Sequence, residues 1–218
     1  MKEFFKRSIT AFILGALFWL SFIYLPPVFF SGILLLILAQ IIIYEWTRIF
    51  NIRGLTFWLL MPFYPILPFV LMIIMNQNPM YHSLLLVLFI LVSSHDTGSY
   101  VVGNLIGKYP IASWISPRKT WEGFFGGWTF ASIGLYWVLW EFDALIPVWE
   151  IIGFSFIICA LSLLGDLFES WLKRRARIKD SGMILPGHGG FLDRFDGIML
   201  TAFFFYIFKD QLIHLFKL

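Results

Sequence analysis

Four carboxylates near the end of the chain have a spacing that could bind a metal ion. They are Asp166, Glu169, Asp193 and Asp196. Asp166 and Glu169 are three residues apart, as are Asp193 and Asp196. On a helix, the two acids of each pair would therefore share one face. Oxygen ligands without thiols suit Mg²⁺, which is often shared with substrate phosphates. Two facing helices would therefore form a magnesium site. The alternative is that these acids pair with Lys173 and Arg194 and only hold the helices together.

Two polar segments near these acids combine cations with helix starts. Lys173 and Arg174 precede a proline- and glycine-rich stretch at 186–190, and Arg118 and Lys119 precede a predicted helix. Backbone amides of a glycine turn before a helix can bind an anion. Each segment alone fits a nonspecific anchor to anionic headgroups. Together with the acids, they favour a substrate rich in phosphate, which His188 is predicted to contact.

The composition says what kind of chain holds these residues. Of 218 residues, 60% are hydrophobic and only 13% are charged, whereas soluble domains carry about 25% charged residues. A soluble globular enzyme, a disordered chain and a disulfide-rich secreted module are excluded. The single cysteine, Cys159, cannot form an internal disulfide. A polytopic membrane protein remains.

Apolar runs predict an all-α, polytopic transmembrane helical bundle of about seven spans. No Asp, Glu, Lys or Arg lies between Arg7 and Glu45, a length that suits two helices, with a break at Pro26 and Pro27. The last two apolar runs are short, and reaching full span length draws the four acids into them. The first run resembles a signal peptide but lacks a small-residue cleavage site, so an uncleaved span is predicted. The predicted spans are 8–25, 28–46, 55–75, 81–103, 121–140, 147–172 and 190–208.

The basic residues predict a cytoplasmic N-terminus. With that orientation all of the 16 basic residues except Lys209 and Lys217 fall on inner segments, as the positive-inside rule requires. Residues 1–80 are then N-terminal transmembrane hairpins. Residues 81–218 form a catalytic transmembrane domain with cytoplasmic loops at 104–120 and 173–189, where function is expected.

These residues also make a pattern typical of a known family. Residues 170–196 resemble the signature of phosphatidate cytidylyltransferase, also called CDP-diacylglycerol synthase. Residues 96–100 and 116–123 are similar to other parts of the same family, so the resemblance covers roughly 90–210. The chain is short for the bacterial members, and Gly197 stands where many relatives carry serine.

The resemblance implies a nucleotidyltransferase that makes CDP-diacylglycerol and pyrophosphate from CTP and phosphatidate in phospholipid biosynthesis. Mg²⁺ is the expected cofactor, held by Asp166, Asp193 and Asp196, and a second, monovalent cation such as K⁺ is an option that the family leaves open. The residues expected to be catalytic are Asp166, Lys173, Arg174, Lys179, Asp193, Arg194 and Asp196. The residues expected to bind substrate are Asp96, Arg118, Lys119, Glu169, Ser170, His188, Gly189 and Gly190.

The expected partners are CTP, phosphatidate and the lipid bilayer, with a homodimer as one possible assembly and no nucleic acid. The expected location is a bacterial plasma (inner) membrane, with the active site on the cytoplasmic side. One alternative is a related enzyme: a polyprenyl or archaeal-lipid cytidylyltransferase, or a lipid kinase. Another is a secondary transporter, but that predicts acids near the bilayer midplane and paired, broken helices. Here the acids crowd the inner end.

Overall fold

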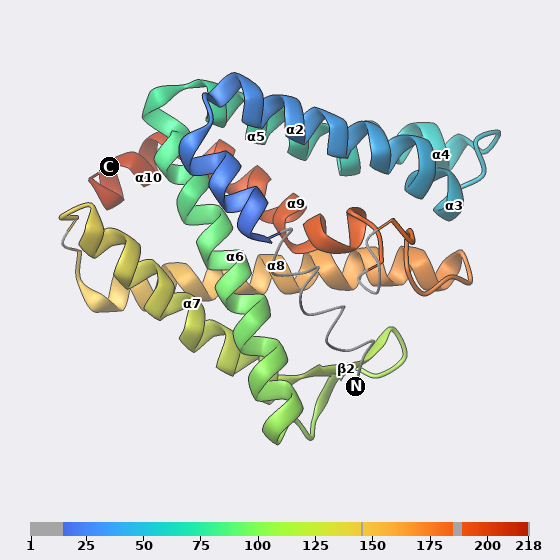
Figure 1. Ribbon diagram of the computed structural model, residues 1–218. Coiled ribbons are helices and arrows are strands. Elements are labelled where there is room, and N and C mark those ends of the chain that lie inside the picture. Colours follow the sequence, from blue (N-terminus) through green and yellow to red (C-terminus); the bar gives the residue numbers. More distant parts are fainter. Residues whose placement is uncertain (1–14, 145, 185–188, 218) are drawn as a thin grey trace. The chain divides into compact units, whose positions relative to one another are not determined.

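The computed structural model describes residues 15–144, 146–184 and 189–217. Within these residues the chain is almost wholly helical, with one two-stranded antiparallel sheet (Figure 1). It divides into two compact units. The first unit comprises Met1–Gln77 and Leu172–Phe195, and the second comprises Asn78–Trp171 and Asp196–Leu218.

The first unit contains a hairpin of two long apolar helical segments. They cover Pro27–Ile49 and Leu55–Gln77. Asn76, near the end of the second segment, donates from Nδ2 to the Pro27 carbonyl at 2.7 Å and to Ser31 Oγ at 2.9 Å. These bonds tie the two segments together where apolar side chains offer no polar partner. The elements are α2 (Pro27–Gln40), η1 (Ile41–Trp46), α3 (Thr47–Ile49), α4 (Leu55–Leu60), η2 (Pro62–Ile66) and α5 (Leu67–Gln77), preceded by a short helix at Gly15–Tyr24.

Both segments widen into a π-helical turn, at η1 and at η2. In η2 the cause is Pro65, which has no amide hydrogen to donate to the preceding turn. The next amide, of Ile66, reaches back five residues to the Met61 carbonyl at 3.2 Å. Such a turn rotates the side chains that follow it, and π-turns are frequent at functional sites. In η1 the turn contains Glu45, the only charged residue of that element.

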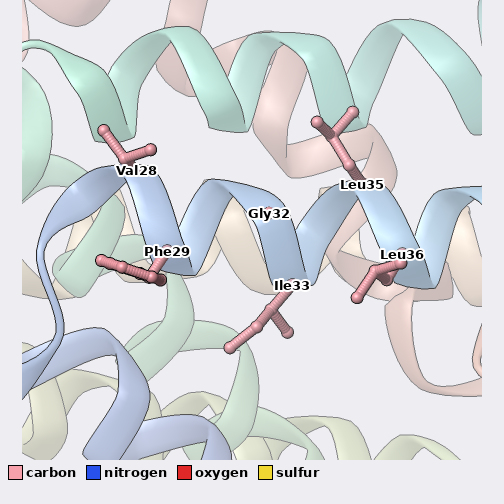
Figure 2. Close-up of a pocket in the computed structure, with 6 residues that line it drawn as sticks. All are labelled: Val28, Phe29, Gly32, Ile33, Leu35 and Leu36. Atoms are coloured by element: carbon pink, nitrogen blue, oxygen red, sulfur yellow. The ribbon is translucent and has the colours of Figure 1, made fainter.

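One face of α2 is apolar and exposed. A pocket along this helix is lined by Val28, Phe29, Gly32, Ile33, Leu35 and Leu36, and Figure 2 shows the side chains of this set on the two sides of Gly32. Val28 is 69% exposed and Leu36 is 72% exposed. An apolar stripe of this kind suits contact with lipid tails rather than water.

In the second unit two helices that cross closely lead to the sheet. They are α6 (Pro79–Ile106) and α7 (Trp121–Glu141). A side chain in place of Gly98 would meet the Phe130 ring at 2.7 Å, so glycine permits the approach. The strands β1 (Pro110–Ala112) and β2 (Ser116–Thr120) join the two helices as a hairpin (Figure 1). Thr120 ends β2 and also caps α7, since its Oγ1 accepts from the Gly123 amide at 3.2 Å.

The remaining helices carry the predicted acids. They are α8 (Val148–Arg175), α9 (Leu192–Ile207) and α10 (Lys209–Phe216). The division between the two units falls inside α8 and inside α9. Asp166 and Asp196 therefore belong to the second unit, whereas Lys173 and Asp193 belong to the first.

The prediction of an all-α membrane protein is confirmed at the level of helices and their composition. Within the described residues, four helical segments are long and apolar enough to cross a membrane, and α9 with α10, bent by 82°, would be a fifth. The four are Pro27–Ile49, Leu55–Gln77, Pro79–Ile106 and Val148–Arg175. The predicted span 121–140 is a helix, α7, but is not among them, and the described part of the first span is short. Seven spans, the orientation of the N-terminus and the division at residue 80 stay predictions.

Candidate functional site

Three carboxylates from two helices gather in the second unit. Ligand oxygens of Asp166 and Glu169 on α8 and of Asp196 on α9 all lie within 4.8 Å of one another. The predicted sharing of a face by Asp166 and Glu169 is thus confirmed. Glu169 is fully buried, and the other two are partly exposed. A set of hard oxygen donors from two helices fits a divalent cation such as Mg²⁺.

Two glycines allow α8 and α9 to approach at this cluster. A side chain in place of Gly165 would meet the backbone oxygen of Asp196 at 2.6 Å, and one in place of Gly197 would meet Ser162 Oγ. The two helices therefore touch backbone to backbone beside the acids. Gly197, a departure from the resembled family, has a local reason because Ser162 fills the space beside it.

A lysine from the sheet reaches the same cluster. Lys119, next to the last residue of β2, forms an ion pair with Asp166, whose other oxygen accepts from Ser170 Oγ at 3.3 Å. The hairpin and the Thr120 cap fix where this lysine leaves the backbone. Asp96 on α6 also lies near enough to Asp196 for their charges to interact. The structure therefore brings together Asp166, Glu169, Asp196 and Lys119, with Ser170 and Asp96 at the edge.

Asp193 lies in the first unit and has a different set of contacts. Its Oδ1 accepts from Lys173 Nζ at 2.6 Å, and its Oδ2 accepts from the Gly190 amide at 2.7 Å and from the Ser181 amide at 3.0 Å. The side chains of Lys173 and Asp193 are 10% and 9% exposed. The alternative interpretation of these acids, pairing with Lys173, therefore holds for Asp193. The assignment of Asp193 as a metal ligand stays a prediction. Glu169, which was predicted to bind substrate, lies instead beside the predicted metal ligands Asp166 and Asp196.

A second acid, Glu45, belongs to the same network as Asp193. Its Oε1 accepts from the Phe191 amide at 2.9 Å, and its Oε2 accepts from the Leu192 amide at 2.8 Å and from Ser181 Oγ at 2.9 Å. Glu45 is 0% exposed. The amides at the start of α9, predicted to hold a phosphate, thus donate to carboxylates of the chain itself.

Among the described residues, the others that were predicted to be catalytic or to bind substrate are exposed or form contacts within the loop before α9. Gly189 has φ +80°, and a side chain there would meet Asp193 Oδ2, so glycine is needed at this position. Arg174 donates from Nη1 to the Ile178 carbonyl at 3.0 Å. His188 and residues 185–187 lie outside the described residues. Exposed at the surface are Arg118, Arg174, Lys179 and Arg194.

Comparison with known proteins identifies the family. The family model described as "Cytidylyltransferase family" matches residues 50–212. The chain belongs to this family. The cytidylyltransferase match covers every acid of the metal-type cluster, Lys119 and the Lys173–Asp193 pair. The resemblance found in the sequence is therefore confirmed.

Individual relatives agree with the family match. Phosphatidate cytidylyltransferase of Rickettsia bellii (strain RML369-C) is 35% identical over 207 residues, covering 90% of this chain and 86% of the relative. The phosphatidate cytidylyltransferase of Staphylococcus aureus (strain COL) is 45% identical over 113 residues, 52% of this chain and 44% of the relative. The chain thus matches less than half the length of the staphylococcal relative and most of the rickettsial one.

Glu45 and Ser181 are the site residues that the sequence analysis missed. Glu45 lies outside the matched residues 50–212 and served only to mark the end of an uncharged run. The sequence did offer a signal for Glu45, because an acidic side chain at the end of an apolar span costs free energy and is retained mostly where it has a partner or a function. Ser181 had no comparable signal, since a loop serine is common.

Replacing Gly165 by alanine tests the close contact of α8 with α9. We expect Gly165→Ala to lower the free energy of unfolding by about 1–3 kcal/mol, because the added methyl group meets a backbone atom that cannot move away cheaply. The measurement is the thermal unfolding midpoint in detergent. Gly153→Ala is the matched control on the same helix, since nothing lies within 4 Å of a side chain added there. Equal midpoints for the two variants would contradict the contact.

Proposed function

We propose that this chain transfers CMP from CTP to phosphatidate, giving CDP-diacylglycerol and pyrophosphate. The observation that carries the proposal is the cluster of Asp166, Glu169, Asp196 and Lys119 within the residues matched to the cytidylyltransferase family. The printed names of the relatives support the same reaction. CDP-diacylglycerol synthesis places the enzyme in phospholipid biosynthesis.

The reaction needs alignment and charge neutralisation more than a strong base. An oxygen of the phosphatidate phosphate attacks the α-phosphorus of CTP, a new P–O bond forms, and the bond to the β-phosphate oxygen breaks as pyrophosphate leaves. The attacking oxygen is already anionic, so the protein's work is to hold two anions in line and to neutralise the charge of the leaving group.

We propose that Asp166, Glu169 and Asp196 hold Mg²⁺. Bound there, the cation would neutralise phosphate charge and bridge the nucleotide to the protein. The donor set supports this, since it offers three carboxylates and no soft ligand. Asp193 stays a predicted ligand, and its contacts with Lys173 and Ser181 favour a role in holding the loop before α9. A second, monovalent cation also stays a prediction.

Lys119 is placed where it can neutralise first the Asp166 carboxylate and then a phosphate group of CTP. Without nucleotide it neutralises Asp166. We propose that with CTP bound, its ammonium group contacts the pyrophosphate portion, because the lysine is held at the edge of the acid cluster by β2. Lys173, Arg174, Lys179 and Arg194 stay predicted phosphate contacts, as do Arg118, His188, Gly189 and Gly190. Asp96 and Ser170 keep their predicted place beside the substrate.

The proposed setting is a bacterial plasma membrane crossed by about seven helices, with the active site on the cytoplasmic side. The distribution of the basic residues supports this side, and CTP is a cytoplasmic substrate. Phosphatidate would reach the site from the inner leaflet, where its phosphate lies at the level of the span ends. The homodimer stays a prediction.

Incorporation of labelled CTP into lipid tests the proposed reaction. We expect membranes containing the protein to form labelled CDP-diacylglycerol from CTP and phosphatidate when Mg²⁺ is present, and to stop when a chelator removes it. Asp196→Asn should lower the rate roughly 100-fold or more, because it removes a charge that holds the metal. The readout is lipid-soluble label per minute.

Asp143→Asn is the control for that substitution. Asp143 is an exposed acid with φ 52°, and asparagine tolerates this conformation. Its activity should equal that of the original chain. Full activity of Asp196→Asn, or activity that is indifferent to the chelator, would contradict the metal assignment. A chain that labels no lipid from CTP would contradict the reaction itself.

Cysteine labelling tests the sidedness. Met183, 82% exposed in the loop before α9, is replaced by cysteine in a Cys159→Ala background, and a membrane-impermeant maleimide is added to intact cells or to inside-out vesicles. We expect labelling only in the vesicles, since the loop is proposed to be cytoplasmic. Asp143→Cys should show the reverse pattern. Labelling of Met183→Cys in intact cells would overturn the proposed orientation.

A further inference from the structure

Glu45 is a buried acid for which the proposed reaction has no use. It lies outside the residues matched to the family, on the π-helical turn η1, and its side chain is 0% exposed. A carboxylate removed from water is costly unless hydrogen-bond donors or a cation replace its hydration. Its contacts therefore show what this residue is for.

Most donors that surround Glu45 come from the loop between α8 and α9 and from the start of α9, and Gln40 adds its Nε2 at 3.5 Å from Glu45 Oε1. The Phe191 and Leu192 amides belong to the start of α9, and Ser181 lies eleven residues before Leu192. Each carboxylate oxygen is used, since Oε1 accepts from one backbone amide and Oε2 from the other and from the serine. Glu45 thus ties Ser181, within the loop, to the start of α9 from a point more than 130 residues earlier in the chain.

Two glycines make room for this carboxylate. A side chain in place of Gly190 would meet Glu45 Oε2 and Ser181 Oγ, and one in place of Gly182 would meet Glu45 Oε1 at 3.1 Å. The carboxylate fills a space that is open only because residues 182 and 190 have no side chain. Arg48, one turn later, adds a bond from Nη1 to the Ser181 carbonyl at 3.3 Å. The end of the segment Pro27–Ile49 therefore binds the loop at several points.

The loop in turn carries the predicted phosphate contacts. Ser181, whose hydroxyl donates to Glu45, donates its backbone amide to Asp193 Oδ2 at 3.0 Å, and Asp193 pairs with Lys173 and with the Gly190 amide. We infer that Glu45 is a positioning residue that fixes the described part of the loop between α8 and α9, and with it Lys173, Asp193 and Gly190. The inference rests on the proposed function, which assigns this loop to the phosphates of CTP.

Glu45→Gln is the sharpest test because it preserves size and removes one acceptor. The amide group of glutamine has one oxygen and one NH₂, so in either orientation an NH₂ faces the Phe191 or the Leu192 amide, donor against donor. We expect the KM for CTP to rise roughly 10- to 100-fold, while the KM for phosphatidate stays within a factor of about three. Hydrogen exchange of peptides covering 176–192 should become faster.

The split between kinetic constants separates positioning from general loss of structure. A variant that is partly unfolded loses active enzyme, which lowers kcat and leaves the KM for CTP unchanged. Glu141→Gln, an exposed acid at the end of α7, is the matched control and should change neither constant. In the double variant Glu45→Gln/Ser181→Ala the effects should be less than additive, since both act on one loop.

A milder variant covers the case in which Glu45→Gln does not fold. Gly182→Ala would displace the Glu45 carboxylate by a few tenths of an ångström, and we expect a KM for CTP raised several-fold with the same faster exchange. Unchanged KM for CTP and unchanged exchange in either folded variant would overturn the inference. A chain that incorporates no CTP would overturn the proposed function instead, and exchange at 176–192 would still decide whether Glu45 holds the loop.

Discussion

A carboxylate that leaves water must be given donors or a cation in return, and this requirement organises both polar clusters of the molecule. In the first unit, Glu45 and Asp193 obtain backbone amides, one serine and one lysine. In the second unit, Asp166 obtains Lys119, and its neighbours Glu169 and Asp196 add further negative charge. The first cluster is satisfied by the chain, and the second is the one suited to a metal ion and its phosphate ligands.

Glycine makes such close polar packing possible. Gly165 lets the backbone of α8 touch that of α9 beside the acids, and Gly182 and Gly190 leave the space that the Glu45 carboxylate fills. The motif glycines thus serve two purposes, close approach of helices and close approach of a side chain to a loop. The amides after Gly189 were predicted to bind phosphate, and in the structure they bind carboxylates. An acid can take the place of a phosphate at a helix start because both are anions.

The sequence predicted the helices and the acid pairs well, because both depend on local spacing. The i,i+3 rule placed Asp166 beside Glu169, and apolar runs located α2, α5, α6 and α8. Spacing could not show that Asp193 turns toward Lys173, since Asp196 shares its predicted face and the choice depends on the Ser181 loop. Nor could it show Glu45, whose partners lie more than 130 residues away. The hairpin of β1 and β2 was expected only as a polar loop.

The central claim is that the cluster of α8 and α9 binds a divalent cation, and Mn²⁺ in place of Mg²⁺ tests it most directly. Anomalous diffraction from crystals grown with Mn²⁺ and a nonhydrolysable CTP analogue would locate the ion. The account predicts a peak within coordination distance of Asp166, Glu169 and Asp196, absent in Asp196→Asn. A peak at Asp193 and Glu45 instead, or one that persists unchanged in Asp196→Asn, would contradict it.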